Sequence, residues 1–209
     1  MADDDFNFEA MPGLPSLPPR GETVLWQGRP NTWRLAVEAC GLNWVAIYFA
    51  AIVVWRGSVG FEIAGVQGAV AYGLPYLFLG LAAGVLILVL AWAQARATVY
   101  TITTARVAMR IGAALSVTFN LPYTQIESAA LDLRKGGTGT VALKLVPGGR
   151  LAYLVCWPHV RPWYFLTQPA LRCIPDAQRV ARLLADAAET RLTQPVLTRA
   201  PVPTAIAAE

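Results

Sequence analysis

The sequence predicts an α+β membrane protein, with a two-helix transmembrane hairpin followed by a small antiparallel β-barrel that a C-terminal helix caps. Residues 69–95 carry no charged side chain, which indicates a membrane-spanning helix. After Arg96 apolar and polar residues alternate in several short runs, which is typical of half-buried strands. The last regular segment has a single apolar stripe, which indicates a helix packed on a core.

Two apolar segments form the predicted hairpin. A helix rises about 1.5 Å per residue, so about 20 apolar residues cross a hydrocarbon core about 30 Å thick. The first span is expected at about 35–55, with its one charge, Glu38, near the start. The glycine-rich residues 57–68 are expected to form a loop, and the second span is expected at about 72–94. Pro75 falls in its first turns, where proline is tolerated.

Basic residues predict the orientation in the membrane. Of the 17 lysines and arginines, 13 lie from Arg96 onward, three precede the first span and one, Arg56, lies between the spans. Because cytoplasmic segments near a membrane carry an excess of basic residues, both termini are expected on the cytoplasmic side of a multi-pass protein. The net charge of +4 is therefore interpreted as topology rather than as a nucleic-acid site.

The region after the spans has the pattern of a small β-domain. Strands are expected at 107–111, 115–121, 131–134, 140–145 and 151–155, separated by glycine-rich turns. A helix is expected at about 174–192. About six or seven short strands closed by one amphipathic helix indicate a barrel-like domain of pleckstrin-homology (PH) type. The expected divisions are 1–30, an acidic and proline-rich segment, 31–95, the hairpin, 96–192, a cytoplasmic PH-like domain, and 193–209, a flexible tail.

The densest group of aromatic residues lies in residues 156–169 (CWPHVRPWYFLTQP). It either plugs one end of the barrel or forms a docking surface for lipid headgroups or a membrane partner, because Trp and Tyr favour that boundary. The candidate partner-docking residues are Trp157, His159, Arg161, Trp163 and Tyr164. A packed or hydrogen-bonded His159 is the main expectation. An imidazole ligand to a tetrapyrrole metal is the alternative.

Catalysis finds little support in the sequence. No Ser/His/Asp arrangement, metal-ligand spacing or phosphate-binding glycine loop is present, so we expect a non-enzyme without cofactor or metal. The three cysteines are scattered and are expected to be reduced and packed. The N-terminus lacks the features of a signal peptide. Basic residues of the β-domain could favour anionic lipid or simply face solvent.

Several stretches resemble one family. They are GETVLWQGRP, YTITTARVAMRIG, NLPYTQIESAALDL, and above all CWPHVRPW followed by PALRCIPDAQRVARLL. Over about residues 10–192 the chain resembles the PuhB family, putative assembly proteins for the photosynthetic reaction centre and core light-harvesting complex of purple bacteria. The strand pattern is also similar to that of other bacterial PH-like membrane proteins. Within the first stretch, Glu22, Trp26 and Arg29 are taken as a candidate N-terminal motif.

The resemblance implies a non-enzymatic assembly factor of the inner (intracytoplasmic photosynthetic) membrane. Its partners would be reaction-centre subunits, core antenna polypeptides and membrane lipids, with self-association as a homodimer also implied. Two alternatives stay open. One is a bacteriochlorophyll carrier that uses His159, and the other is a generic membrane anchor that binds anionic lipid through its PH-like domain.

Overall fold

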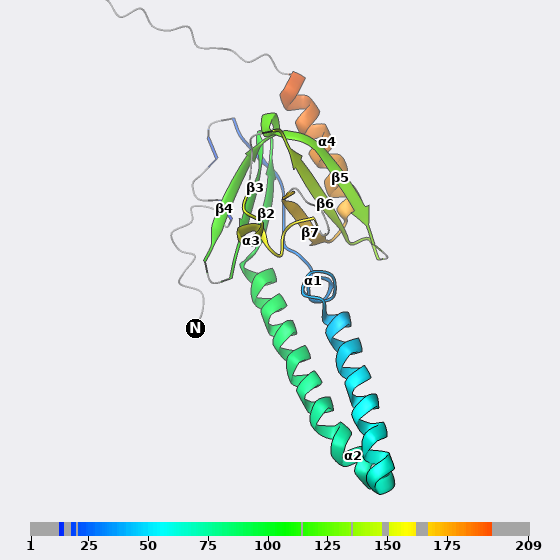
Figure 1. The fold of residues 1–209 in the computed structure, drawn as a ribbon. Helices are drawn as coiled ribbons and strands as arrows, with labels where there is room; N and C mark the ends of the chain where they lie inside the picture. The colour runs from blue at the N-terminus through cyan, green and yellow to red at the C-terminus, as the bar shows by residue number, and fades with distance from the viewer. Residues whose placement is uncertain are drawn as a thin grey trace, which may run out of the picture.

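The structure is a computed structural model that describes residues 13–14, 18–19, 21–113, 115–134, 136–147, 151–161 and 167–193. The predicted tail and most of the acidic N-terminal segment, together with Trp163 and Tyr164, lie outside the described residues. The described part is a β-domain from one end of which a long helical element projects (Figure 1). This is the α+β architecture that the sequence predicts.

The β-domain consists of two antiparallel sheets. The first has the order β1-β2-β3-β4 and the second the order β5-β6-β7. The strands are β1 (Val24–Gly28), β2 (Val99–Thr103), β3 (Arg106–Ile111), β4 (Val117–Pro122), β5 (Ile126–Leu133), β6 (Gly139–Leu145) and β7 (Ala170–Ile174). The strands thus form one sheet of four and one sheet of three, and the closure of these sheets into a barrel stays a prediction.

The core of the domain lies where the two sheets and α4 (Ala177–Thr193) meet. Tyr100 and Met109 from the first sheet and Leu143 and Leu171 from the second are fully buried in one cluster. From α4 the stripe Ala177, Val180, Leu184 and Ala187 enters the same cluster, while Ala181 and Ala188 pack at its margin. The predicted amphipathic helix is confirmed, because residues three and four apart share one face.

Short elements complete the domain. They are α1 (Thr32–Glu38), the 3-10 turn η2 (Tyr123–Gln125) and α3 (Tyr153–Cys156). Asn31 caps α1 by accepting a hydrogen bond from the Arg34 N–H on its side-chain oxygen, at 3.1 Å. Figure 1 shows α1 and α3 toward the end of the domain from which α2 extends.

The long element α2 (Leu42–Ala97) is non-helical at two residues, Ala64 and Gly65. Gly65 has φ +58°, a left-handed conformation that glycine adopts without steric cost. Figure 1 shows the two arms of α2 side by side, so the chain reverses at this break. A Cβ at Gly80 would lie 2.7 Å from the Cβ of Phe49, which shows how closely the arms approach.

Two boundaries of the expected spans are wrong. Leu35 and Ala36 belong to α1 and are fully buried, with Leu35 packed in a cluster with Ala95 and Cys173, so they are not part of a first span. The expected loop 57–68 is helical except at Ala64 and Gly65. The two errors have different causes. Apolar content does not show that the chain near Leu35 forms a separate helix packed on the domain, and glycine content does not show that the chain reverses at two residues only.

Two strands were missed and one was misassigned. Every residue of β2 and β7 is buried, but so are five of the six residues of β3, so burial alone does not explain why they were missed. β7 (ALRCI) lacks a regular alternation, and β2 (VYTIT) directly follows the long apolar segment. Residues 151–155 were expected to be a strand, but Tyr153 begins the single helical turn α3. The strands expected near 107–111, 115–121, 131–134 and 140–145 correspond to β3, β4, β5 and β6.

The domain is not continuous in sequence. β1 precedes α2 and pairs with β2, which follows it, with Gln27 opposite Thr101 and Gly28 opposite Tyr100. α1 also packs between α2 and β7 through Leu35, Ala95 and Cys173. Residues 24–38 therefore belong to the folded domain, and its expected start at Arg96 is wrong. The helical element is an insertion between two neighbouring strands of one sheet.

Candidate functional site

A buried hydrogen-bond chain lies where α2 enters the β-domain. The Thr98 hydroxyl donates to the Gln94 carbonyl at 2.7 Å and lies 3.0 Å from Nε2 of His159. Since the one Thr98 proton is used on Gln94, His159 must donate from Nε2 and accept at Nδ1. The Tyr100 hydroxyl then donates to Nδ1 and accepts from the Arg172 N–H at 3.3 Å. The chain connects β7 to the last turn of α2.

His159 is neutral in this setting. It is fully buried, and burial, with a smaller contribution from the Arg172 charge, lowers its pKa to about 3. Burial likewise raises the pKa of Tyr100, so its hydroxyl keeps its proton and can donate to the imidazole. The expected packed, hydrogen-bonded histidine is confirmed. An axial metal ligand needs a free ring nitrogen, and both nitrogens of His159 are engaged here.

Arg172 is the second buried member of this region and is 4% exposed. Its Nη1 donates to the Pro158 carbonyl at 3.1 Å and its Nη2 to the Glu38 carbonyl at 2.9 Å. Glu38 ends α1, where helix carbonyls lack partners within the helix, so the guanidinium caps this helix. Arg172 thereby ties α1 and the segment before His159 to β7.

The structure separates the predicted docking residues. Trp157 is 44% exposed and can meet a partner, whereas the fully buried His159 cannot, so its docking role is wrong. Arg161 is half-buried, and it donates two hydrogen bonds to Gln168, from its backbone N–H to the backbone carbonyl and from its Nη1 to the side-chain oxygen. Trp163 and Tyr164 lie outside the described residues.

The residues of the N-terminal motif act mainly within the fold. Glu22 accepts hydrogen bonds from Arg106, from Nε at 2.9 Å and Nη2 at 3.2 Å, and one from the Thr103 hydroxyl at 2.7 Å. This bidentate pair ties the segment before β1 to β3. Trp26 is half-buried against the core, and Arg29 is exposed. Of the three, Arg29 alone is exposed and so open to contact with another molecule.

An exposed apolar patch, of which the sequence reasoning named only Trp157, lies on and beside α3. It consists of Tyr153, Leu154, Val155 and Trp157, of which Leu154 is 85% exposed. Leu115, in the β3–β4 connection, is 83% exposed. A run of large apolar residues that does not fit the strand alternation was the available signal. We call Tyr153, Leu154, Val155 and Trp157 the α3 patch.

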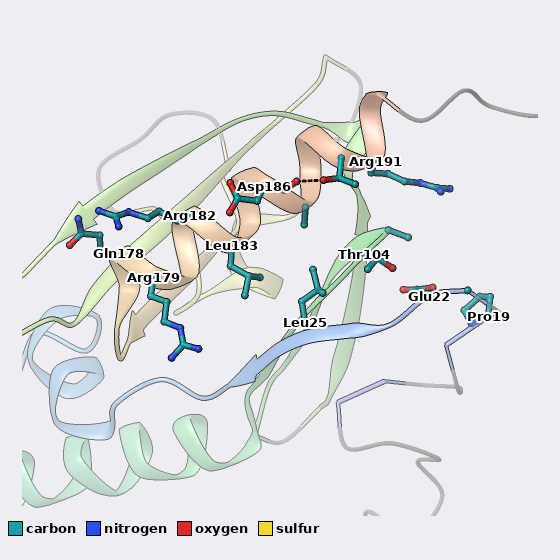
Figure 2. A pocket seen from close by; sticks show the side chains of 14 residues that line it. Pro19, Glu22, Leu25, Thr104, Gln178, Arg179, Arg182, Leu183, Asp186 and Arg191 are labelled. Carbon is teal, nitrogen blue, oxygen red and sulfur yellow. Dashed lines mark hydrogen bonds between the residues drawn. The ribbon is translucent and has the colours of Figure 1, made fainter.

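Two cavities have chemically different walls. The larger, about 1130 Å³, lies between α4 and the β1 edge of the first sheet. Figure 2 shows Leu183 of α4 and Leu25 of β1 pointing toward each other across it, with Arg179 beside them. The smaller, about 200 Å³, has Arg134, Arg161 and Arg172 in its wall. Among the described residues no three His, Cys, Asp or Glu side chains gather as metal ligands.

Comparison with known proteins identifies the family. A family model described as Bacterial PH domain matches residues 36–188, most of the chain. The chain belongs to this bacterial PH domain family. It is also 47% identical over 205 residues to a Rhodobacter capsulatus protein named "Uncharacterized 23.7 kDa protein in puhA 5'region", covering 96% of this chain and 95% of that protein. No solved structure matches significantly. The family match includes α2, so the helical insertion lies within the matched region of the domain.

Proposed function

We propose that this protein is a non-enzymatic, membrane-anchored assembly factor for the photosynthetic reaction centre and its core light-harvesting complex. α2 forms a transmembrane hairpin in the inner photosynthetic membrane, and the PH-like domain docks onto subunits on the cytoplasmic side. The proposal refines the resemblance to the PuhB family. It is supported by the relative of Rhodobacter capsulatus, whose name refers to the 5′ region of puhA.

The proposal that α2 lies in a membrane rests on the exposed apolar side chains of this helix. Only 6% of its most apolar 18 residues are buried, and Trp44 and Val54 are more than 70% exposed. Exposed apolar surface of this extent is stable in lipid but not in water. The arms, 42–63 and 66–97, would be about 33 Å and about 48 Å long at 1.5 Å per residue, so each can cross a bilayer.

Both ends of α2 lie in one domain, because Leu35 before it packs near Ala95 at its end. An element that leaves and re-enters the same domain must cross the membrane an even number of times. The break at Ala64 and Gly65 supports two crossings. The distribution of basic residues supports a cytoplasmic side for the domain.

The α3 patch is the surface we assign to docking on a reaction-centre or antenna polypeptide. It lies toward the end of the domain from which α2 extends, where a partner embedded in the same bilayer would be met (Figure 1). Trp157 is the strongest candidate anchor, since aromatic residues with large contact areas dominate binding energies. The pigment-carrier alternative is disfavoured because both ring nitrogens of His159 are engaged.

The proposal is tested with the double variant Leu154→Asn and Trp157→Ala in a photosynthetic host. Both side chains are exposed, so the variant should fold and reach the membrane. Loss of an anchor residue costs about 2 kcal/mol or more of binding, which corresponds to roughly 30-fold weaker partner capture. We therefore expect less co-purified reaction-centre protein and a lower reaction-centre absorbance, at an unchanged level of the protein in membranes.

The matched control is Leu192→Asn, because Leu192 is 60% exposed at the far end of α4. It should leave the reaction-centre yield unchanged. Normal reaction-centre yield and capture in the double variant would rule out docking through the α3 patch. Normal yield in a strain that lacks the whole protein would rule out the assembly function itself.

A further inference from the structure

The larger cavity forms a groove between α4 and β1, and we call it the α4–β1 groove. The α4 residues in its wall run from Gln178 to Arg191, a length of about 20 Å at 1.5 Å per residue. Its volume of about 1130 Å³ exceeds the roughly 300–1,000 Å³ of typical small-molecule pockets. About six extended residues of a polypeptide have the same length as this wall. The groove therefore has the dimensions of a site for a peptide segment.

The wall opposite α4 includes an edge strand. Among the described strands β1 pairs with β2 alone, so the backbone N–H and C=O groups along its other edge have no strand partner. Leu25 is the extra residue of a bulge in β1 and has no partner in β2. It is 40% exposed, and Figure 2 shows it pointing toward the half-buried Leu183 of α4. A bound segment can bury an apolar side chain between these two leucines.

The groove has more basic than acidic side chains available to a ligand. Its wall contains three guanidinium groups, from Arg179, Arg182 and Arg191. Of the two carboxylates in the wall, Glu22 already pairs with Arg106, which leaves Asp186. In the part of the chain that the structure describes, neither Arg179 nor Arg182 forms an ion pair, and both are exposed. These two arginines are available to acidic side chains of a ligand.

Arg179 occupies an unfavourable position in α4. It is the third residue of the helix, whose first turn contains no acidic residue. The helix dipole places a partial positive charge at this end, which favours a carboxylate and disfavours a guanidinium. Figure 2 shows Arg179 projecting from α4 toward the β1 side of the groove. An acidic ligand in the groove would compensate for this charge.

We propose that the α4–β1 groove binds an extended, acidic segment of another polypeptide. The free edge of β1 supplies backbone hydrogen bonds, as in other proteins that add a strand to a sheet edge. Leu25 and Leu183 contact an apolar side chain of the segment, and Arg179 and Arg182 pair with its Asp or Glu side chains. The proposal is independent of the assembly function, because the walls of the groove define it.

The position and charge of the groove favour a polypeptide over a membrane or a nucleic acid. Thr104 in its wall follows the end of β2 that lies away from α2, so the groove extends away from the end of the domain that α2 leaves. A membrane that α2 spans would lie at the opposite end. The carboxylate of Asp186 in the wall would repel the closely spaced phosphates of a nucleic acid.

The experiment uses the full-length protein in neutral detergent. The probes are two fluorescein-labelled peptides of about six residues, one of alternating glutamate and valine and one of alternating lysine and valine. Fluorescence anisotropy measures their binding. We expect the acidic peptide to bind about tenfold more tightly than the basic peptide, and this difference to shrink at high salt, because salt screens exposed charges.

Arg179→Glu is the main variant. A glutamate near the N-terminus of a helix is favoured by the dipole, so the fold should be retained. The variant should bind the acidic peptide about tenfold more weakly and the basic peptide more tightly, a reciprocal change that misfolding would not produce. Arg29→Glu is the matched control, because Arg29 is exposed and lies outside the groove. It should bind both peptides like the unmodified protein.

Three results would overturn the proposal. Absent or equal binding of the two peptides, or equal behaviour of Arg179→Glu and Arg29→Glu, would show that the charges of the groove do not select a ligand. Tighter binding of the acidic peptide after removal of residues 1–12 or 194–209 would assign the groove to a segment of this chain. Conversion of a dimer to a monomer by the acidic peptide, measured by light scattering, would assign it to a second copy.

Discussion

α2 and α4 distribute their apolar side chains in different ways. In α4 the buried positions Val180, Leu184 and Ala187 share one face, and charged residues such as Arg182 cover the other. In α2 the described residues show no such division, and large apolar side chains are exposed along both arms. α4 is built for a boundary between protein and water, and α2 for surroundings that are apolar on every side. The difference indicates which solvent each helix meets.

The largest effect on the free energy of unfolding is expected for a substitution in α4. Leu184→Ala removes a side chain that is 3% exposed in the main core cluster and should lower the free energy of unfolding by about 2–5 kcal/mol. Chemical denaturation of the full-length protein in detergent measures it. Leu86→Ala in α2 removes a side chain that is 60% exposed and should have a much smaller effect. Equal effects would contradict the comparison.

A smaller effect is expected from the packing of the α2 arms on each other. A Cβ at Gly68 would lie 2.0 Å from the Gly60 carbonyl oxygen, so Gly68→Ala must shift a backbone and should destabilise the paired arms by about 1–3 kcal/mol. Thermal unfolding in detergent, with spin-label distances between the arms, measures it. Gly84→Ala is the matched control, because its Cβ would meet only Leu42 at 3.9 Å. Similar results for both variants would show that close approach at Gly68 is unimportant.

At neutral pH the effect is smallest at the junction of the two regions, because there it develops only as the pH falls. His159 has a pKa of about 3 in the fold and an ordinary value of 6.5 when unfolded. Between these values the unfolded chain binds the extra proton, so stability is full above about pH 6.5 and falls as the pH drops toward 3. The slope is about 1.4 kcal/mol per pH unit for one proton.

His159→Gln removes this titration, so the unfolding free energy of the variant should depend less steeply on pH between about 4 and 6. Denaturation at a series of pH values, in both proteins, gives the two slopes. The variant will start from a lower stability because it loses hydrogen bonds to Thr98 and Tyr100. Parallel slopes would show that His159 is not held neutral in the fold.

Elements whose apolar residues recur with a regular period were predictable from the sequence. β3, β4 and β6 alternate in sequence and α4 has its apolar stripe, although five of the six residues of β3 are buried. β7 (ALRCI) was not found because its apolar and polar residues do not alternate regularly, and β2 directly follows the long apolar segment. Of the candidate site, the partial exposure of Trp157 agrees with the expectation, whereas the docking role of His159 does not, since residue type alone does not reveal burial.

The sequence by itself determined the character of each segment. It showed that α2 is apolar on all sides and that the rest folds as a small β-domain with a helix. Only the tertiary structure decided which segments meet. It pairs β1 with β2 across the whole of α2, joins Thr98 to His159 and Arg172 to Glu38, and encloses three arginines around one cavity. The periodicity of apolar residues indicates the local environment of a residue. These contacts instead join residues far apart in the chain, and a single sequence does not show which distant residue each one contacts.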